Sequence, residues 1–507
     1  MINFDAYEVW FLTGSQHLYG SETLRRVDEH SRAMVEALGG SGRIPVRVVW
    51  RPVLTTPESI RAALSEASAN RACIGVIAWM HTFSPGKMWI NGLTALTKPL
   101  LHLHTQFNRD IPWSEIDMDF MNLNQSAHGD REFGHITARL RLPRTVIAGF
   151  WQDADVQERI GVWARAAAAV ADMRGGGIAR FGDNMRYVAV TEGDKVSAEI
   201  TLGLGVNGYG VSDLAEVYDT VSPREADRLV HEYVEQYEFD DAVSRDPAQM
   251  ARVGVQARIE IAMRRFLERG GFTGFTTTFE DLHGIPQLPG LAVQRLMADG
   301  YGFGAEGDWK QAALVRAMKV MATGLPGGTS FMEDYTYHME PGRCLVLGAH
   351  MLEICPSIAA GKPRVEVHPL GIGGKDDPAR LVFDGAGGDA INATLVDMGD
   401  RFRILVNEVK AVPPPSPMPK LPVARVTWIP KPDFTGGLEG WILAGGAHHT
   451  GYSTAIGSPH MEAFAAILGL EFLRLGEGTS IENFKRELLY SEAVSRSGAR
   501  GAWCGSR

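Results

Sequence analysis

The chain has 507 residues, of which 45% are hydrophobic and 22% charged, and its formal net charge is −10 at pH 7. At about 150 residues per domain this length predicts roughly three domains, and the composition is ordinary for a globular protein. The negative charge and the scattered Lys and Arg residues argue against a nucleic-acid partner. A small sugar, another neutral metabolite or a cation fits this charge better.

The N-terminus and the cysteines indicate where the protein works. The chain does not open with the basic and apolar segments of a signal peptide, and no apolar run approaches the ~18 residues of a membrane helix. We therefore expect a cytoplasmic protein with no membrane partner. Cys73, Cys344 and Cys355 are predicted to be buried thiols of a reducing compartment, and Cys504 to lie in a frayed tail over residues 495–507.

The first third of the chain alternates β-branched runs with helical patterns. The predicted strands cover residues 7–12, 46–50, 73–79, 100–104 and 146–150, and the helices cover residues 24–38, a segment from 62 onward, and 156–173. Such a βαβα order is typical of a parallel, doubly wound sheet, which binds ligands in the loops after its strands. Residues 14–20 and 104–108 are such loops.

Glycines at 175–177 mark the first predicted domain boundary. Beyond them the α/β pattern resumes, with strands at residues 178–181 and 275–279 and helices at 212–221, 225–237 and 247–267. From about residue 332 the pattern changes to short strand-like runs, at residues 344–348, 364–368, 380–383, 393–397 and 403–412. We predict two Rossmann-like, doubly wound α/β domains, 1–174 and 175–328, and an antiparallel, barrel-like β domain, 329–507.

A GxGxxG pattern at Gly203–Gly208 matches the dinucleotide-binding fingerprint and so indicates a different function. An alternating run at residues 196–201 precedes it, and a helical pattern begins at Ser212. The third glycine lies too far from that helix to pack in it, so the match is weak. A nucleotide-dependent dehydrogenase stays as an alternative hypothesis on this motif.

Two glutamates and three histidines in the C-terminal two-fifths form the strongest candidate site: Glu306, Glu333, His350, His448 and His449. Carboxylates and imidazoles delivered from separate turns can converge on one divalent ion and leave further coordination positions open. Taken singly, the glutamate at 306 could cap the helix that follows, and the histidine at 350 could be an interior residue. Adjacent side chains of an extended chain point to opposite faces, so one member of the histidine pair can face the site while the other braces it or faces elsewhere.

A second group of residues suits a sugar. Gln125 and His128 can hydrogen-bond hydroxyl groups, and the aromatic face of Phe279 can pack on C–H groups. A sugar-binding protein without catalysis is therefore another alternative hypothesis.

Seven motifs in order make the chain similar to the L-arabinose isomerase family over nearly its whole length. They cover residues 12–20, 104–108, 181–186, 304–310, 332–337, 348–353 and 444–450. The resemblance implies two Rossmann-like domains and a Greek-key β domain. It also implies a manganese site, with Co²⁺ or Mg²⁺ as alternative ions, whose ligands are Glu306, Glu333, His350 and His449.

The activity implied by this resemblance is the interconversion of L-arabinose and L-ribulose, with D-galactose to D-tagatose as a further reaction. Glu306 and Glu333 are the candidates for moving protons, and hydrogen travels either as a proton through an enediol or as a hydride. Further expected sugar contacts are Gln16, Leu18 and Met185. Asp308, Glu353 and His448 are expected to orient the metal ligands by hydrogen bonds. The family implies a homo-oligomer, a hexamer or tetramer, with the active site near a subunit interface and His128 supplied by a neighbouring subunit.

Overall fold

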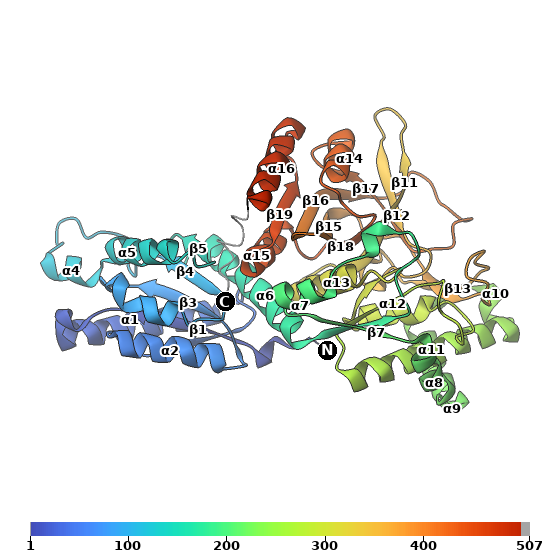
Figure 1. Ribbon diagram of the computed structural model, residues 1–507, viewed down its shortest axis with the longest axis horizontal. Coiled ribbons are helices and arrows are strands. Elements are labelled where there is room, and N and C mark those ends of the chain that lie inside the picture. Colours follow the sequence, from blue (N-terminus) through green and yellow to red (C-terminus); the bar gives the residue numbers. More distant parts are fainter. Residues whose placement is uncertain (1, 498–507) are drawn as a thin grey trace. The chain divides into compact units, whose positions relative to one another are not determined.

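The structure is a computed structural model that describes residues 2–497 (Figure 1). The described residues form two compact units, one built from residues 2–171, 462–469 and 492–497 and the other from residues 172–461 and 470–491. Within residues 2–497, every helix is too short or too polar to cross a lipid bilayer. Cys73 and Cys355 are buried as predicted, whereas Cys344 is partly exposed and Cys504 lies outside the described residues.

The N-terminal unit contains the predicted doubly wound sheet. Its five strands are all parallel, in the order β2(Arg47–Trp50), β1(Glu8–Gly14), β3(Cys73–Met80), β4(Leu100–His104) and β5(Thr145–Ala148). The helices of this part of the chain are α1(Gly20–Gly40), α2(Pro57–Ala69), α3(Ile90–Leu93), α4(Met118–Leu123), α5(Ser126–Arg139) and α6(Ala154–Gly175). Every residue of β1 and β3 is buried, as expected for central strands covered on both faces.

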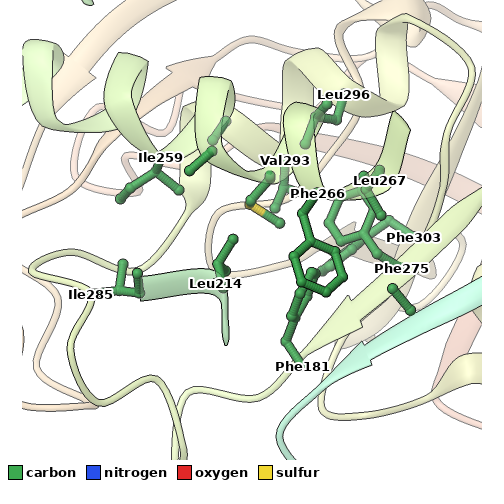
Figure 2. Packing of buried hydrophobic residues seen from close by; sticks show 14 of the residues in the cluster. Phe181, Leu214, Ile259, Phe266, Leu267, Phe275, Ile285, Val293, Leu296 and Phe303 are labelled. Carbon is green, nitrogen blue, oxygen red and sulfur yellow. The ribbon is translucent and has the colours of Figure 1, made fainter. Parts of the chain in front are cut away.

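The second unit begins with another parallel sheet, in the order β10(Gly302–Gly304), β9(Gly274–Thr277), β6(Gly177–Phe181) and β7(Gly205–Tyr209). Its helices are α7(Lys195–Leu202), α8(Val211–Asp219), α9(Pro223–Gln236), α10(Asp241–Ser244), α11(Pro247–Gly270) and α12(Gly290–Ala298). Aromatic rings from three strands, Phe181, Phe275 and Phe303, are buried in one cluster with Phe266 of α11 (Figure 2). This core holds the strands whose C-terminal ends lead into the candidate site.

The GxGxxG segment does not form a nucleotide-binding turn. Residues 195–202, which include the alternating run, are the helix α7, because Asp194 caps it by accepting hydrogen bonds from the N–H groups of Val196 and Ser197. Gly203 ends this helix in a left-handed conformation, and the remaining glycines lie in β7. The order is therefore helix, turn, strand, whereas the fingerprint requires strand, turn, helix. The motif on which the dehydrogenase hypothesis rested is thus not a nucleotide-binding motif.

The C-terminal part contains the predicted antiparallel barrel. Six strands close on themselves in the order β11(Thr329–His338), β12(Leu345–Ala349), β17(Arg425–Pro430), β16(Phe402–Val412), β15(Gly388–Asp397) and β18(His449–Ser453), and β18 pairs again with β11. A further strand, β19(Glu471–Leu475), runs parallel to β16. The helices in this part of the chain are α14(Phe434–Leu443), α15(Ser458–Leu468) and α16(Ile481–Arg496), and residues 462–468 of α15 and residues 492–496 of α16 belong to the N-terminal unit.

Two of the strands predicted for the barrel lie outside it. β13(Arg364–Val367) and β14(Ala379–Val382) form a separate three-stranded sheet with β8(Glu238–Phe239). Their local sequence does predict extended structure. Their partner is a strand more than a hundred residues earlier in the chain, which no local pattern reveals.

The helix α13(Trp309–Ala322) connects the parallel sheet and the barrel of this unit. It packs against β10 and β9 of the parallel sheet and against β11 and β18 of the barrel, and nearly all of its residues are buried. The approach to β10 is close, because a Cβ atom at Gly302 would lie 2.0 Å from the carbonyl oxygen of Ala312. A side chain larger than hydrogen would therefore push the helix off the strand.

We predict that Gly302→Ala destabilises the protein by about 1–3 kcal/mol, the usual cost of overpacking, because the clash is with backbone. The matched control is Gly254→Ala in α11, where an added Cβ meets no atom within 4 Å. That change should be neutral or stabilise by up to about 1 kcal/mol, the helix-propensity difference. Urea unfolding of both variants measures the difference, and equal midpoints would contradict the close packing of α13.

Candidate active site

Glu306 occupies a tight turn between β10 and α13. It adopts a left-handed backbone conformation, with φ of 58°, which costs a non-glycine residue on the order of 1–3 kcal/mol and is typical of functional sites. Its carbonyl oxygen accepts a hydrogen bond from the N–H of Met185 at 3.0 Å, and the N–H of Gly307 donates to the carbonyl of Thr277 at 3.1 Å. These two bonds hold the turn so that the carboxylate projects toward the barrel.

The other candidate ligands come from three neighbouring barrel strands. Glu333 of β11 pairs with Ala349 of β12 on one side and with His449 of β18 on the other. His350 directly follows β12. The register of these strands therefore brings Glu333, His350 and His449 to one place, although they are far apart in sequence.

Three of the candidate ligands converge closely. Glu306, His350 and His449 each offer one donor atom, and these atoms all lie within 4.8 Å of one another. His449 Nε2 lies 3.8 Å from a carboxylate oxygen of Glu306. This nitrogen is buried and has no hydrogen-bond partner among residues 2–497. An unpartnered buried nitrogen beside a carboxylate and a second imidazole fits a divalent cation that accepts mixed N and O ligands.

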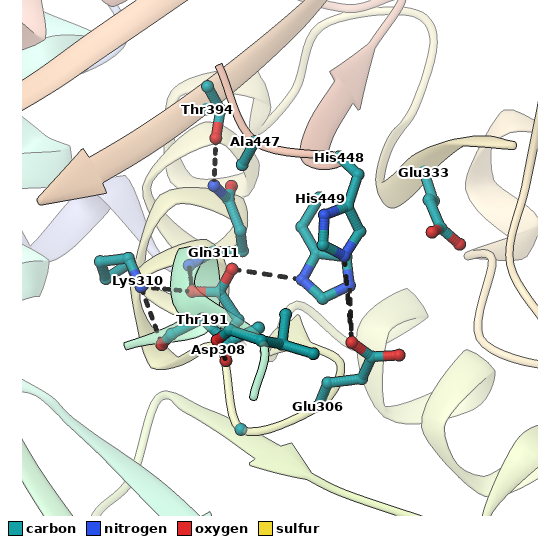
Figure 3. A network of polar contacts seen from close by, with 12 residues as sticks. Thr191, Glu306, Asp308, Lys310, Gln311, Glu333, Thr394, Ala447, His448 and His449 are labelled. Atoms are coloured by element: carbon teal, nitrogen blue, oxygen red, sulfur yellow. Dashed lines mark hydrogen bonds and ion pairs between the residues drawn. The ribbon is translucent and has the colours of Figure 1, made fainter. Parts of the chain in front are cut away.

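Glu333 lies beside this group, and one of its carboxylate oxygens is 3.9 Å from His350 Nε2. In Figure 3 it stands apart from the contact between Glu306 and the histidine pair. The structure thus brings all four predicted ligands to one site.

Each candidate histidine ligand is held by a carboxylate on its other nitrogen. His350 Nδ1 lies 2.5 Å from Glu353, and His449 Nδ1 lies 3.2 Å from Asp308. A carboxylate at Nδ1 keeps the proton there and leaves the Nε2 lone pair for a metal. Asp308 is therefore placed to orient His449, and Glu353 to orient His350.

The histidine pair does not alternate between two faces as expected. His448 Nε2 lies 3.9 Å from Glu306, and the rings of His448 and His449 are 4.2 Å apart. Figure 3 shows both rings beside the Glu306 carboxylate. The strand β18 begins only at His449, so the alternation of an extended chain does not apply to His448. His448 is partly exposed, whereas His449 is fully buried.

Charge interactions oppose burial throughout the site. Burial favours the neutral form of Glu306, but the neighbouring histidines, His448 first, hold the pKa of this glutamate below its ordinary value. Burial also works against the charged form of His350, but the surrounding glutamates raise its pKa to about 9. Burial is the main effect at His449 and lowers its pKa. Charge interactions thus outweigh burial at Glu306 and His350, whereas burial outweighs them at His449.

A cavity of about 320 Å³ opens over these groups. Its polar side carries Glu306, Glu333, His350 and Glu353, and the predicted sugar contacts Met185 and Phe279 lie in its wall. The sequence did not single out further lining residues, which are Thr277, Leu282, Leu288, Pro289, Ala305, Tyr335, Met351, Leu352 and Ile372. Tyr335 and Met351 belong to the motifs at 332–337 and 348–353, whereas Ile372 lies in a glycine-rich segment outside every motif.

The remaining predicted sugar contacts belong to the N-terminal unit. Gln16 precedes a short 3-10 helix, His17–Tyr19, in which Leu18 is exposed. Gln125 precedes α5 and accepts a hydrogen bond from the hydroxyl of Tyr19 at 3.3 Å. The ring of His128 lies against Phe83. Gln16 and Leu18 follow β1, whereas Gln125 and His128 lie at the start of α5. Their contact with a sugar stays a prediction.

Comparison with known proteins identifies the family. Profiles of the L-arabinose isomerase N-terminal, central and C-terminal domains match residues 3–175, 177–324 and 328–471. The L-arabinose isomerase of Geobacillus thermodenitrificans is 58% identical over 496 residues, which cover 98% of this chain and 100% of the relative. That of Herpetosiphon aurantiacus is 59% identical over 492 residues, 97% of this chain and 98% of the relative. That of Thermotoga maritima is 58% identical over 492 residues, with the same coverage. Similarity at this level along nearly the whole of each chain shows that the protein belongs to the L-arabinose isomerase family.

Proposed function

We propose that the protein interconverts L-arabinose and L-ribulose, an intramolecular oxidation and reduction, with the aid of a divalent ion, Mn²⁺ in preference to Co²⁺ or Mg²⁺. The observation that carries the proposal is the convergence of Glu306, His350 and His449, the first two of which line a cavity, in a chain of this family. D-galactose, converted to D-tagatose, is the proposed second substrate because it shares the reacting stereocentres.

Glu306, Glu333, His350 and His449 would hold the ion, which supplies Lewis-acid stabilisation of the charge that develops on two neighbouring sugar oxygens. The two glutamates reach into the cavity from different elements, the turn after β10 and the strand β11. The neighbouring histidines lower the pKa of Glu306 and so favour its ionised form, the form that can accept a proton. The glutamates move a proton between the two oxygens if hydrogen passes from C2 to C1 as a hydride. They move one between the two carbons if an enediol forms.

The apolar residues of the cavity wall would bind the C–H groups of the sugar. Met185, Phe279, Leu282 and Ile372 line the same cavity as hydrogen-bonding and charged groups. Such a wall packs on the C–H groups of a sugar and excludes water from the reacting carbons. A sugar-binding protein without catalysis would need the wall but not the converging ligands, so this arrangement favours the enzyme.

We further propose a homo-oligomer, a hexamer or tetramer, whose pocket is completed near a subunit interface by His128 of a neighbouring subunit. Large apolar side chains on the N-terminal unit, Leu18, Trp113 and Met118, are exposed and would be covered by such an interface. We also propose that the protein works in the cytoplasm, where unpaired thiols such as Cys73 and Cys355 persist.

Two architectural proposals accompany this function. The first is a three-domain chain with boundaries near residues 174 and 328. The second is that the barrel is a Greek key. It is supported by the position of β18, which lies beside β15, the first of the consecutive neighbours β15, β16 and β17.

Metal removal tests the proposed function. Chelated protein that is verified to be metal-free should form no L-ribulose from L-arabinose, because this mechanism relies on the ion to stabilise the charge on the sugar oxygens. Added Mn²⁺ should restore ketose formation better than Mg²⁺, since nitrogen ligands suit Mn²⁺ better. Full activity in the metal-free protein would remove the ion from the mechanism.

Glu306→Gln and Glu333→Gln test the glutamates as proton carriers. Each substitution keeps the shape but removes the proton acceptor, so each should lower the rate of ketose formation at least ~100-fold while the circular dichroism spectrum is unchanged. Glu340→Gln, in the exposed turn between β11 and β12, is the matched control and should keep full activity. A glutamate whose glutamine variant turns over at the control rate is not a proton carrier.

Alanine variants of the histidine pair distinguish their roles. His449 is fully buried with its Nε2 unpartnered, whereas His448 is partly exposed. His449→Ala should therefore weaken Mn²⁺ binding, measured by the electron paramagnetic resonance signal of free Mn²⁺, more than His448→Ala does. The opposite order would assign the metal ligand to His448.

A further inference from the structure

The ammonium group of Lys310 is buried directly behind the candidate metal site. Lys310 Nζ lies 3.1 Å from Asp308 Oδ1, and it donates hydrogen bonds to the carbonyl oxygens of Thr191 at 2.9 Å and Glu192 at 2.7 Å. These three acceptors use all three of its protons. We propose that Lys310 is a positioning residue that sets the metal-binding orientation of His449 and Glu306. This inference deepens the proposed function and rests on its metal assignment.

The first line of support runs through Asp308 to His449. The carboxylate of Asp308 is fully buried, with one oxygen facing Lys310 and the other 3.2 Å from His449 Nδ1 (Figure 3). A buried carboxylate is costly unless a cation and hydrogen bonds compensate it. Lys310 is that cation, and it fixes the carboxylate where His449 must donate its Nδ1 proton. The Nε2 atom of His449 is then presented to Glu306 without a competing hydrogen.

The second line of support runs through the loop at residues 184–192 to Glu306. The carbonyl oxygen of Thr191, which accepts from Lys310, also accepts from Asn184 Nδ2 at 2.6 Å. The same amide nitrogen donates to the carbonyl of Gly307 at 3.2 Å, and the next residue, Met185, donates its N–H to Glu306. Lys310 thereby anchors the loop that clamps the left-handed turn carrying Glu306.

The loop at residues 184–192 packs tightly against the turn that carries Glu306. A Cβ atom at Gly307 would lie 2.5 Å from Asn184 Cα, so the loop and the turn are in backbone contact. A displacement of residues 184–192 would be transmitted to the carboxylate of Glu306. Loss of the Lys310 ammonium should therefore disturb two of the candidate ligands together.

A second lysine of α13 supplies a matched control. Lys319 is also buried, and its Nζ donates to the carbonyl of Thr329 at 2.6 Å and lies 3.4 Å from Cys355 Sγ. These contacts involve neither Asp308 nor the candidate histidine ligands. Lys319→Met removes a buried ammonium from the same helix and reports the general cost of doing so, without the connection to the ligands.

The experiment compares Mn²⁺ binding and thermal unfolding in the full-length protein. Wild type, Lys310→Met, Lys319→Met, Asp308→Asn and the double variant Asp308→Asn/Lys310→Met are stripped of metal and titrated with Mn²⁺, and the free ion is followed by electron paramagnetic resonance. Lys310→Met should raise the Kd for Mn²⁺ by ~10–100-fold, as loss of an orienting partner does. Lys319→Met should leave it within error of wild type, whatever its effect on Tm.

The double variant shows whether Lys310 acts through Asp308. Removing Lys310 should change the Kd much less when Asp308 is already Asn, because the carboxylate that it orients is gone. Lys310→Gln, which keeps a donor for the two carbonyl groups but not the charge, is the second variant if Lys310→Met does not fold. It should also weaken binding.

Three results would overturn the inference. They are a wild-type Kd in a folded Lys310 variant, an equal loss in Lys310→Met and Lys319→Met, and fully additive effects in the double variant. Failure of the proposed function is distinguishable, because wild type itself would then bind no Mn²⁺ or form no ketose. If wild type binds no Mn²⁺, the proposed role of Lys310 has no basis either.

Discussion

The buried carboxylate of Asp308 is the constraint on which the candidate site depends. It lies at the N-terminus of α13, where it accepts a hydrogen bond from the N–H of Gln311 at 3.3 Å, faces the ammonium group of Lys310 and contacts His449 of the barrel. A fully buried carboxylate without such partners would cost several kcal/mol. The turn after β10, the start of α13 and the start of β18 can therefore satisfy this charge only when all three are in place. The same contacts that compensate the charge of Asp308 therefore also position His449 in the candidate site.

The candidate ligands come from two kinds of sheet, and α13 joins them. The parallel sheet delivers Glu306 through a turn whose close packing excludes side chains, since a Cβ atom at Gly304 would lie 2.1 Å from the carbonyl oxygen of Asp308. The antiparallel barrel delivers Glu333 and His449 through their direct pairing. Rigid elements on both sides suit a reaction in which the reacting atoms must be held within a fraction of an ångström.

The distribution of polarity over the cavity matches the chemistry of a sugar. Three carboxylates and an imidazole line the cavity, and the raised pKa of His350, about 9, and the lowered pKa of Glu306 indicate that charge interactions outweigh burial at these two groups. Met185, Phe279 and Ile372 line the same cavity. Hydroxyl groups and C–H groups of a small polyol can thus be recognised separately, and the charged groups are kept near the carbons that exchange hydrogen.

The sequence by itself determined the elements and the candidate ligands. Runs of β-branched residues between helical patterns predicted the strands of the first sheet, because side-chain periodicity is a local property. Glu306, Glu333, His350 and the pair His448–His449 stood out because their residue types in glycine-rich turns point to metal chemistry, and the family resemblance selected His449 from the pair. The structure brings Glu306, Glu333, His350 and His449 together.

Only the tertiary structure decided the partners of these elements. The glycines at 203–208 proved to follow a helix, since Asp194 caps residues that alternate like a strand. β13 joined a strand from the middle of the chain instead of the barrel. Both histidines of the pair reached Glu306, and Lys310 became the partner of Asp308. Strand pairing and the compensation of a buried charge depend on residues that are distant along the chain, so a local pattern carries no information about them.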